Sequence, residues 1–194
     1  MLIYVTSRKL CRDDFFQRIN HLAKGKPSAI MLREKDLDLS EYEALAIKVK
    51  ELCRAHHVPL IINQNFSVAE KLELPNIHFS MDNLRKYKSE LRPFIVVGAS
   101  VHSVAEAEEA FKLGATYLIA GHVFSTDCKK GVPPRGLPFL KKICDLVPIP
   151  VFAIGGITKD KVTDIKMTGA KGVCIMSEAM TCRNPVVLAN EFRR

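Results

Sequence analysis

The sequence predicts an α/β protein whose chain folds into a single compact (β/α)8 barrel, the TIM barrel. Eight short runs of apolar and β-branched residues recur along the chain, as is typical of parallel strands buried on both faces. Amphipathic, helix-like stretches separate these runs, and the linkers are short, which favours a closed βα repeat. With 194 residues, the chain has the length of one well-cored domain. We therefore expect residues 1–194 to form one barrel domain.

The eight expected strands end in polar or glycine-containing segments. They are LIYVTS (2–7), AIMLRE (29–34), PLIINQ (59–64), IHFSMD (77–82), FIVVGAS (94–100), YLIAGHVF (117–124), PVFAIGG (150–156) and GVCIMS (172–177). Between the second and third runs, LSEYEALAIKVKELCRAHH is amphipathic, and Ser40 with Glu43 predicts a capping box at its start. Helix-like stretches end at Gly114 and Gly169. No G-x-G-x-x-G follows the first run, which disfavours a doubly wound open sheet.

Composition narrows the classes of partner. The chain is 47% hydrophobic and 26% charged, as in ordinary globular proteins, and no apolar stretch approaches the roughly 20 residues of a membrane span. In the first residues, MLIYVTSRKL, the basic residues follow the apolar run, whereas in a signal peptide they precede it. We therefore expect a cytoplasmic protein. The net charge of +8 suits either nucleic acid or an anionic small molecule. The basic residues are scattered and lack interleaved aromatics, so we expect no nucleic-acid and no membrane partner. The six cysteines form no C-x-x-C pair, which disfavours zinc.

In this fold the active-site residues lie at the carboxyl ends of the strands and in the loops that follow. Gly155 and Gly156, in AIGGIT, allow backbone N–H groups to approach an anion, and CIMSEA brings Met176 and Ser177 to the last strand end. The loops after the seventh and eighth strands form the usual phosphate site of such barrels. We therefore expect phosphate binding at these residues; the alternative is that the glycine pair is only a tight turn.

Three further strand ends carry cationic or titratable side chains. Arg33, in MLREKD, could clamp a carboxylate or phosphate bidentately, or could form a structural ion pair with Glu34 or Asp36. Lys129 and Lys130 follow the sixth run, either as phosphate contacts or as solvated charges. In the same loop Asp127 and Arg135 could pair with each other.

Histidine offers the proton-transfer chemistry. His122 follows Gly121 at the end of YLIAG, and its side chain can take and return a proton near neutral pH. A lone histidine near an apolar strand is more often structural. The position of His122 at a strand end, before a long polar loop, favours a catalytic role. Ser100 and His102, in ASVHS, are expected to line the pocket, and His78, in NIHFS, is interpreted as a packed core residue.

Seven stretches, in the same order along the chain, resemble the thiamine-phosphate synthase and TenI family of (β/α)8 enzymes. These are MLREKD, PLIINQNFSVA, IHFSMDNL, VVGASVHS, GATYLIAGHVF, PVFAIGGIT and GAKGVCIMS. The resemblance covers nearly the whole chain. In that family, a synthase joins a pyrimidine pyrophosphate to a thiazole phosphate and uses Mg²⁺ to carry the leaving pyrophosphate. Its Asn-Asp pair after strand three and its Asp after strand four match Asn63-Gln64 and Asn83 here, so both carboxylates are replaced by amides.

The loop GHVFSTDCKKG resembles instead the thiazole tautomerase branch of the family. This resemblance implies an isomerase of thiamine biosynthesis that converts a carboxylated dihydrothiazole phosphate into its aromatic isomer without metal or cofactor. It implies that His122 is the acid/base, that Gly155, Gly156, Met176 and Ser177 hold the phosphate, and that Arg33 and Lys129 meet the carboxylate. Two alternatives stay open: a thiamine-phosphate synthase with an altered Mg²⁺ site, and a non-catalytic regulatory protein. The expected partner is a small phosphorylated thiazole, and a homodimer is left open.

Overall fold

The computed structural model describes residues 1–192 and confirms the predicted fold class. Within this part of the chain, eight parallel strands pair in the order β1-β2-β3-β4-β5-β6-β7-β8 and close into a barrel. Helices alternate with the strands along the sequence, as a (β/α)8 barrel requires. No helix among the described residues is long and apolar enough to cross a membrane.

The bounds of the elements are as follows. The strands are β1 (Leu2–Val5), β2 (Ala29–Leu32), β3 (Leu60–Asn63), β4 (Asn76–Phe79), β5 (Val96–Val101), β6 (Tyr117–Gly121), β7 (Val151–Ile154) and β8 (Gly172–Ile175). The helices are α1 (Phe15–Lys24), α2 (Leu39–Ala55), α3 (Phe66–Lys71), α4 (Met81–Tyr87), α5 (Val104–Lys112), α6 (Gly136–Leu146), α7 (Val162–Met167), α8 (Ser177–Thr181) and α9 (Pro185–Glu191). Short 3₁₀ turns occur at η1 (Arg8–Leu10), η2 (Asp127–Lys129) and η3 (Lys159–Lys161).

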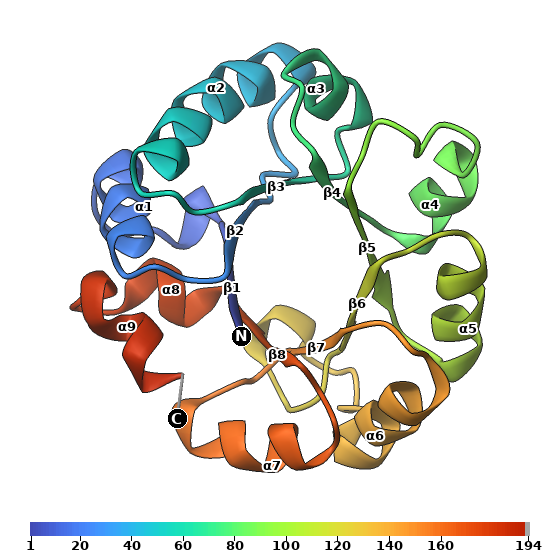
Figure 1. The fold of residues 1–194 in the computed structure, drawn as a ribbon. Helices are drawn as coiled ribbons and strands as arrows, with labels where there is room; N and C mark the ends of the chain where they lie inside the picture. The colour runs from blue at the N-terminus through green and yellow to red at the C-terminus, as the bar shows by residue number, and fades with distance from the viewer. Residues whose placement is uncertain (193–194) are drawn as a thin grey trace. The chain divides into compact units, whose positions relative to one another are not determined.

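The chain divides into two compact units, and the first is Met1–Ile77 together with the chain from Ile175 on. In it β1 pairs with β2 and β2 with β3, all parallel. The core of this unit includes Tyr4, Leu22, Ile30 and Ile62, which are almost completely buried. In Figure 1, α2 and α3 lie on the outer side of β2 and β3, and α9 lies beside α1.

The second unit is His78–Cys174. Here β5, β6, β7 and β8 pair in sequence, with Ser100 opposite Ile119 and Gly121 opposite Ile154. Figure 1 shows α5 and α6 on the outer side of β5 and β6, the strands that precede them along the chain. Phe79, Leu84 and Leu118 are completely buried in this unit. Because burying a large apolar side chain is worth roughly 1.5–3 kcal/mol, these residues fix the strands that carry the candidate site.

Seven of the eight strands end earlier than the sequence predicts. The predicted sixth strand, for example, runs to Phe124, whereas β6 ends at Gly121. After that point the backbone N–H groups of Val123 and Phe124 donate to Ile154 O and Gly155 O. The apolar pattern continues past the strand because the following loop packs against β7. Arg33, His122, Gly155 and Met176, which were expected at strand ends, therefore lie just beyond the strands, whereas Ser100 lies within β5.

The N-cap expected at Ser40 is wrong. Helix α2 begins at Leu39, and Asp38 caps it: the Asp38 side chain accepts from the backbone N–H of Glu41 at 2.8 Å, and the Glu41 side chain accepts from the Asp38 N–H at 3.1 Å. The sequence offers this box two residues before Ser40 and Glu43. Asp38 has the extended backbone of an N-cap, φ −69° and ψ 173°, so the earlier pair forms the box.

Candidate functional site

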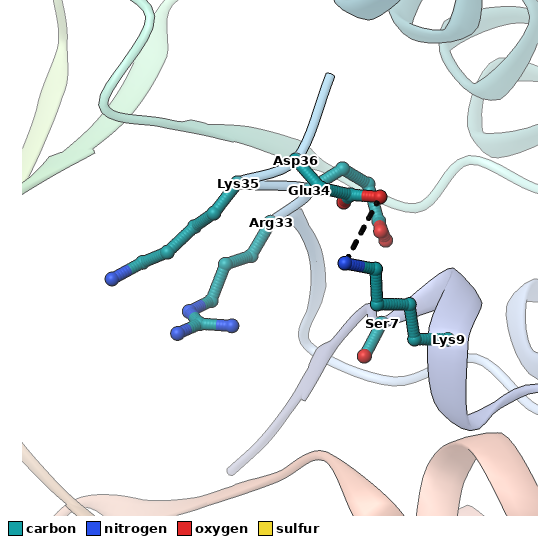
Figure 2. A pocket seen from close by; sticks show the side chains of 6 residues that line it. All are labelled: Ser7, Lys9, Arg33, Glu34, Lys35 and Asp36. Carbon is teal, nitrogen blue, oxygen red and sulfur yellow. Dashed lines mark ion pairs between the residues drawn. The ribbon is translucent and has the colours of Figure 1, made fainter.

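In the first unit, the chain after β2 carries the cationic candidate Arg33. Its half-buried side chain extends beside that of Lys35, away from Glu34 (Figure 2). Ser7, Lys9 and Asp36 line the same small pocket. Arg33 Nη1 lies 4.0 Å from Met176 Sδ, so the side chain of Met176 reaches the Arg33 guanidinium.

The ion pair that the sequence offered as an alternative for Arg33 does not form. Buried Glu34 accepts from Thr6 Oγ1 at 2.7 Å and from the backbone N–H of Arg8 with both oxygens. Asp36 lies 3.3 Å from Arg8 Nη2 and 3.5 Å from Lys9 Nζ, the contact dashed in Figure 2. Both carboxylates are engaged by η1. Among the residues that the structure describes, the Arg33 guanidinium thus has no carboxylate partner.

The last strand end also belongs to this unit. Met176 is the N-cap of α8, and Ser177 is the first residue of this five-residue helix. Ser177 is exposed and Met176 half-buried. These positions agree with the expected strand-end placement, and the role of both residues in phosphate binding stays a prediction.

In the second unit, His122 directly follows β6 and is only 6% exposed. Its Nε2 lies 3.2 Å from the carbonyl oxygen of Val132. Since a carbonyl only accepts, Nε2 carries a proton in this contact. The loop is further closed by Arg135 N–H, which donates to His122 O, and by Gly136 N–H, which donates to Val123 O. His122 is thus a buried residue whose hydrogen bonds to Val132 and Arg135 connect the start of the loop after β6 to its end. Its catalytic role stays a prediction.

The glycine pair after β7 packs against this same loop. Gly155 and Gly156 have φ of 97° and 64°, values that favour glycine. A Cβ on Gly155 would collide with the His122 side chain, and one on Gly156 with Ser125 O and with Phe124 Cβ at 2.9 Å. The close approach of residues 122–125 therefore requires both glycines, whether or not an anion binds there.

The remaining candidates of this unit lie on β5 and after it, and in the loop after β6. Ser100 is half-buried in β5. His102 lies 3.6 Å from Glu106 Oε2, and partial burial lowers its pKa. Lys129 is exposed in η2. The pair that Asp127 and Arg135 could have made does not form: Asp127 lies 3.8 Å from Lys130 Nζ, and the Arg135 guanidinium lies over the Phe139 ring.

Two residues near these positions were not predicted as part of a site. Lys161 Nζ donates to Gly156 O at 2.8 Å and lies over the Phe124 ring, which adds a cation beside the glycine pair. His78 is buried as predicted, but it also bonds Tyr117 OH and Ser100 Oγ. The sequence signal for the hydrogen bonds of His78 is a polar side chain in an otherwise apolar strand, and in the folded chain Gly98 leaves the space that His78 occupies.

The residues at the expected magnesium positions do not suit that ion. The Asn63 amide donates to Met31 Sδ, and Gln64 offers a neutral amide. Asn83 offers another amide, and the neighbouring Asp82 side chain is 93% exposed and pairs with Arg85 at 3.0 Å. Within residues 1–192 no cluster of three or more His, Cys, Asp or Glu side chains could hold a metal ion. Because Mg²⁺ is held by carboxylates in proteins, these residues do not form its usual site.

Eight parallel strands that close into a barrel, with helices alternating between them, define the class of this protein as a (β/α)8 barrel. The family described as thiamine monophosphate synthase (TMP-TENI) matches residues 2–179. The chain therefore belongs to the thiamine monophosphate synthase family.

Several relatives support this assignment over nearly the full chain. The thiamine-phosphate synthase of Fusobacterium nucleatum is 35% identical over 176 residues, which cover 89% of this chain and 85% of the relative. That of Methanobrevibacter smithii is 30% identical and covers 99% of this chain and 95% of the relative. A solved thiamine phosphate pyrophosphorylase from Pyrococcus furiosus superposes with a TM-score of 0.88 at 30% identity, over 99% of this chain and 93% of that one.

The predicted isomerase activity is wrong. Relatives that are 30–35% identical over most of the chain are named thiamine-phosphate synthases, which are transferases and not tautomerases. The isomerase prediction depended on the short loop GHVFSTDCKKG and on the two amides, whereas the family match covers residues 2–179. The role of His122 as acid/base of a tautomerisation falls with that prediction.

Proposed function

We propose that this chain is a thiamine-phosphate synthase that joins a pyrimidine pyrophosphate to a thiazole phosphate and releases pyrophosphate. The observation that carries this proposal is the match of residues 2–179 to the family, together with relatives of that name at 30–35% identity. Both substrates and the leaving group are anions, which suits a chain with a net charge of +8.

In the first unit, Arg33 is the proposed anion-binding side chain. A guanidinium binds phosphate oxygens bidentately, and Glu34 and Asp36 are held by Thr6 and the η1 residues rather than by Arg33. Met176 and Ser177 are proposed as further substrate contacts at the end of β8. In the second unit the proposed contacts are Ser100, His102, His122, Lys129, Gly155 and Gly156.

The proposed synthase has an altered metal-binding position, because Gln64 and Asn83 replace carboxylates in the resemblance given above. Gln64 has a positive φ of 69°, a conformation in which Asp and Asn are enriched. Gln64→Asp therefore restores a carboxylate without new backbone strain, and Gln64→Asn is its neutral control.

The test is the formation of thiamine phosphate from the two purified precursors, followed by chromatography over a range of Mg²⁺ concentrations. We expect product from the wild-type chain, and half-maximal activity at a lower Mg²⁺ concentration in Gln64→Asp than in Gln64→Asn. Arg33→Ala is expected to raise the KM by roughly tenfold or more, the effect of losing a hydrogen bond to a charged group. No product at any Mg²⁺ concentration would contradict the proposed function.

A further inference from the structure

Three side chains from neighbouring strands form a buried hydrogen-bonded row in the second unit. His78 of β4 lies between Tyr117, the first residue of β6, and Ser100 of β5. His78 Nδ1 is 3.0 Å from Tyr117 OH, and His78 Nε2 is 2.8 Å from Ser100 Oγ. His78 and Tyr117 are almost completely buried, whereas Ser100 is half-buried. The row therefore leads from the protein interior to a side chain that a ligand can reach.

Gly98 provides the space for this row. A Cβ at Gly98 would collide with both the Tyr117 ring and His78 Nδ1. The absence of a side chain at this position in β5 lets the phenol and the imidazole meet. The hydrogen bond between Tyr117 and His78 is thus part of the strand packing and not an incidental contact.

His78 is neutral at physiological pH. Burial lowers its pKa to about 3, because a charged imidazolium would lose its hydration there. A neutral imidazole has one nitrogen that donates and one that accepts. The direction of the whole row therefore depends on which nitrogen carries the proton.

Tyr117 settles that direction. Among the residues that the structure describes, its hydroxyl has one hydrogen-bond partner, Nδ1 of His78. If Nδ1 donated to the phenol oxygen, the phenol proton would remain buried without an acceptor, which costs about 1–3 kcal/mol. If the phenol donates to Nδ1, every polar atom of the pair is satisfied. Nδ1 is then the acceptor, and Nε2 carries the proton.

The consequence falls on Ser100. An Nε2–H group donates to Ser100 Oγ, so the hydroxyl proton of Ser100 cannot point back to His78. This arrangement excludes a serine activated by a histidine base, because such a serine must donate to the imidazole. Ser100 instead presents its own O–H to whatever lies on its exposed side.

We propose that Tyr117 and His78 are positioning residues that fix Ser100 as a hydrogen-bond donor to an anionic phosphoryl oxygen of the substrate. The identity of the ligand rests on the proposed function. The direction of the hydrogen bonds rests only on the arrangement of Tyr117, His78 and Ser100. Both the thiazole phosphate and the pyrophosphate group present such an oxygen, so binding of the two anions is compared below.

The first test reads the imidazole of His78 directly by ¹⁵N NMR of histidine-labelled protein. We expect His78 to carry its proton on Nε2 in the wild type, and Tyr117→Phe to increase the population with the proton on Nδ1. Tyr42→Phe is the matched control, since it removes another buried phenol that donates to a backbone carbonyl, Leu32 O. A proton on Nδ1 of His78 in the wild type would overturn the proposal. This result does not depend on any activity, so it is independent of the proposed function.

The second test titrates inorganic phosphate and pyrophosphate into the wild type and into Ser100→Ala. We expect binding of at least one anion to weaken roughly tenfold, as for a lost hydrogen bond to a charged group. The anion affected identifies the group that Ser100 contacts. Equal affinity of both proteins for both anions would overturn the role of Ser100. If Ser100→Ala binds an anion more weakly than the wild type and the wild type shows no synthase activity, the role of Ser100 as a donor is supported and only the proposed function is contradicted.

Discussion

At the scale of single residues, buried polar side chains form hydrogen bonds with partners that are distant in the sequence and cannot be identified from it. Arg18 is buried in α1; it donates to Asp13 through Nε and Nη2 and to Cys182 O through Nη1 at 2.7 Å. This guanidinium links the start of α1 to the end of α8. Its hydrogen bond to Asp13 lowers the pKa of that carboxyl.

The Asp13 contact predicts a pH-dependent stability. Because the folded-state pKa of Asp13 lies below its unfolded value, the pair stabilises the protein above the unfolded pKa, and this stability is lost as pH falls through the folded pKa. Asp13→Asn should lower the free energy of unfolding by roughly 1 kcal/mol at pH 7, a value reduced for the half-exposed carboxylate. The difference should shrink below about pH 4. Urea unfolding at several pH values measures it.

Asp145→Asn is the matched control, since Asp145 pairs with Lys141 on the exposed face of one helix. Its effect at pH 7 should stay within about 0.5 kcal/mol. A difference between wild type and Asp13→Asn that stays constant from pH 7 to pH 3 would contradict the proposed link.

The sequence could predict where the candidate residues lie relative to the strands, but not which other side chains they form hydrogen bonds with. Strand-end logic placed Arg33, His122 and Gly155 at the carboxyl ends of their strands, and the structure has each of them directly after the last residue of its strand. It could not show that Glu34 is engaged by Thr6, because residues 28 positions apart meet only in the folded chain. It also took His78 for simple packing, since apolar alternation cannot reveal a hydrogen-bonded neighbour on another strand.

At the scale of elements, the sequence predicted where helices and strands lie better than where they begin and end. Helix α2 shows why: two overlapping boxes, Asp38 with Glu41 and Ser40 with Glu43, both fit the local rule. The structure selects the first, in which backbone geometry and both reciprocal hydrogen bonds are satisfied. The strands are overestimated at their carboxyl ends because apolar loop residues such as Val123 continue the pattern while packing against β7.

The α2 cap gives a direct comparison of two variants. Asp38→Ala should lower the free energy of unfolding by about 0.5–2 kcal/mol through loss of the cap. Ser40→Ala, one residue inside the helix start, should change it by less than about 0.5 kcal/mol. Chemical denaturation of both variants measures the two effects. A larger loss in Ser40→Ala than in Asp38→Ala would show that the helix starts at the later box.

At the scale of the whole molecule, the repeating βα pattern was enough to predict the barrel, since few arrangements satisfy eight buried parallel strands. The prediction that residues 1–194 form one domain leads to a calorimetric expectation. Thermal unfolding should occur in a single transition, with equal calorimetric and van't Hoff enthalpies. Two resolved transitions would instead indicate that the unit His78–Cys174 unfolds separately from the rest.

The activity was the level at which sequence reasoning failed. A short loop and two amides decided the prediction in favour of the tautomerase branch of the family, whereas relatives that are 30–35% identical over most of the chain are named synthases. A handful of residues can vary within a family without a change of reaction class. The central claim is that this chain joins the two thiamine precursors. Mass spectrometry of a reaction with both precursors and Mg²⁺ tests it most directly. Thiamine phosphate and pyrophosphate formed in equal amounts are the predicted result, and unchanged precursors would contradict it.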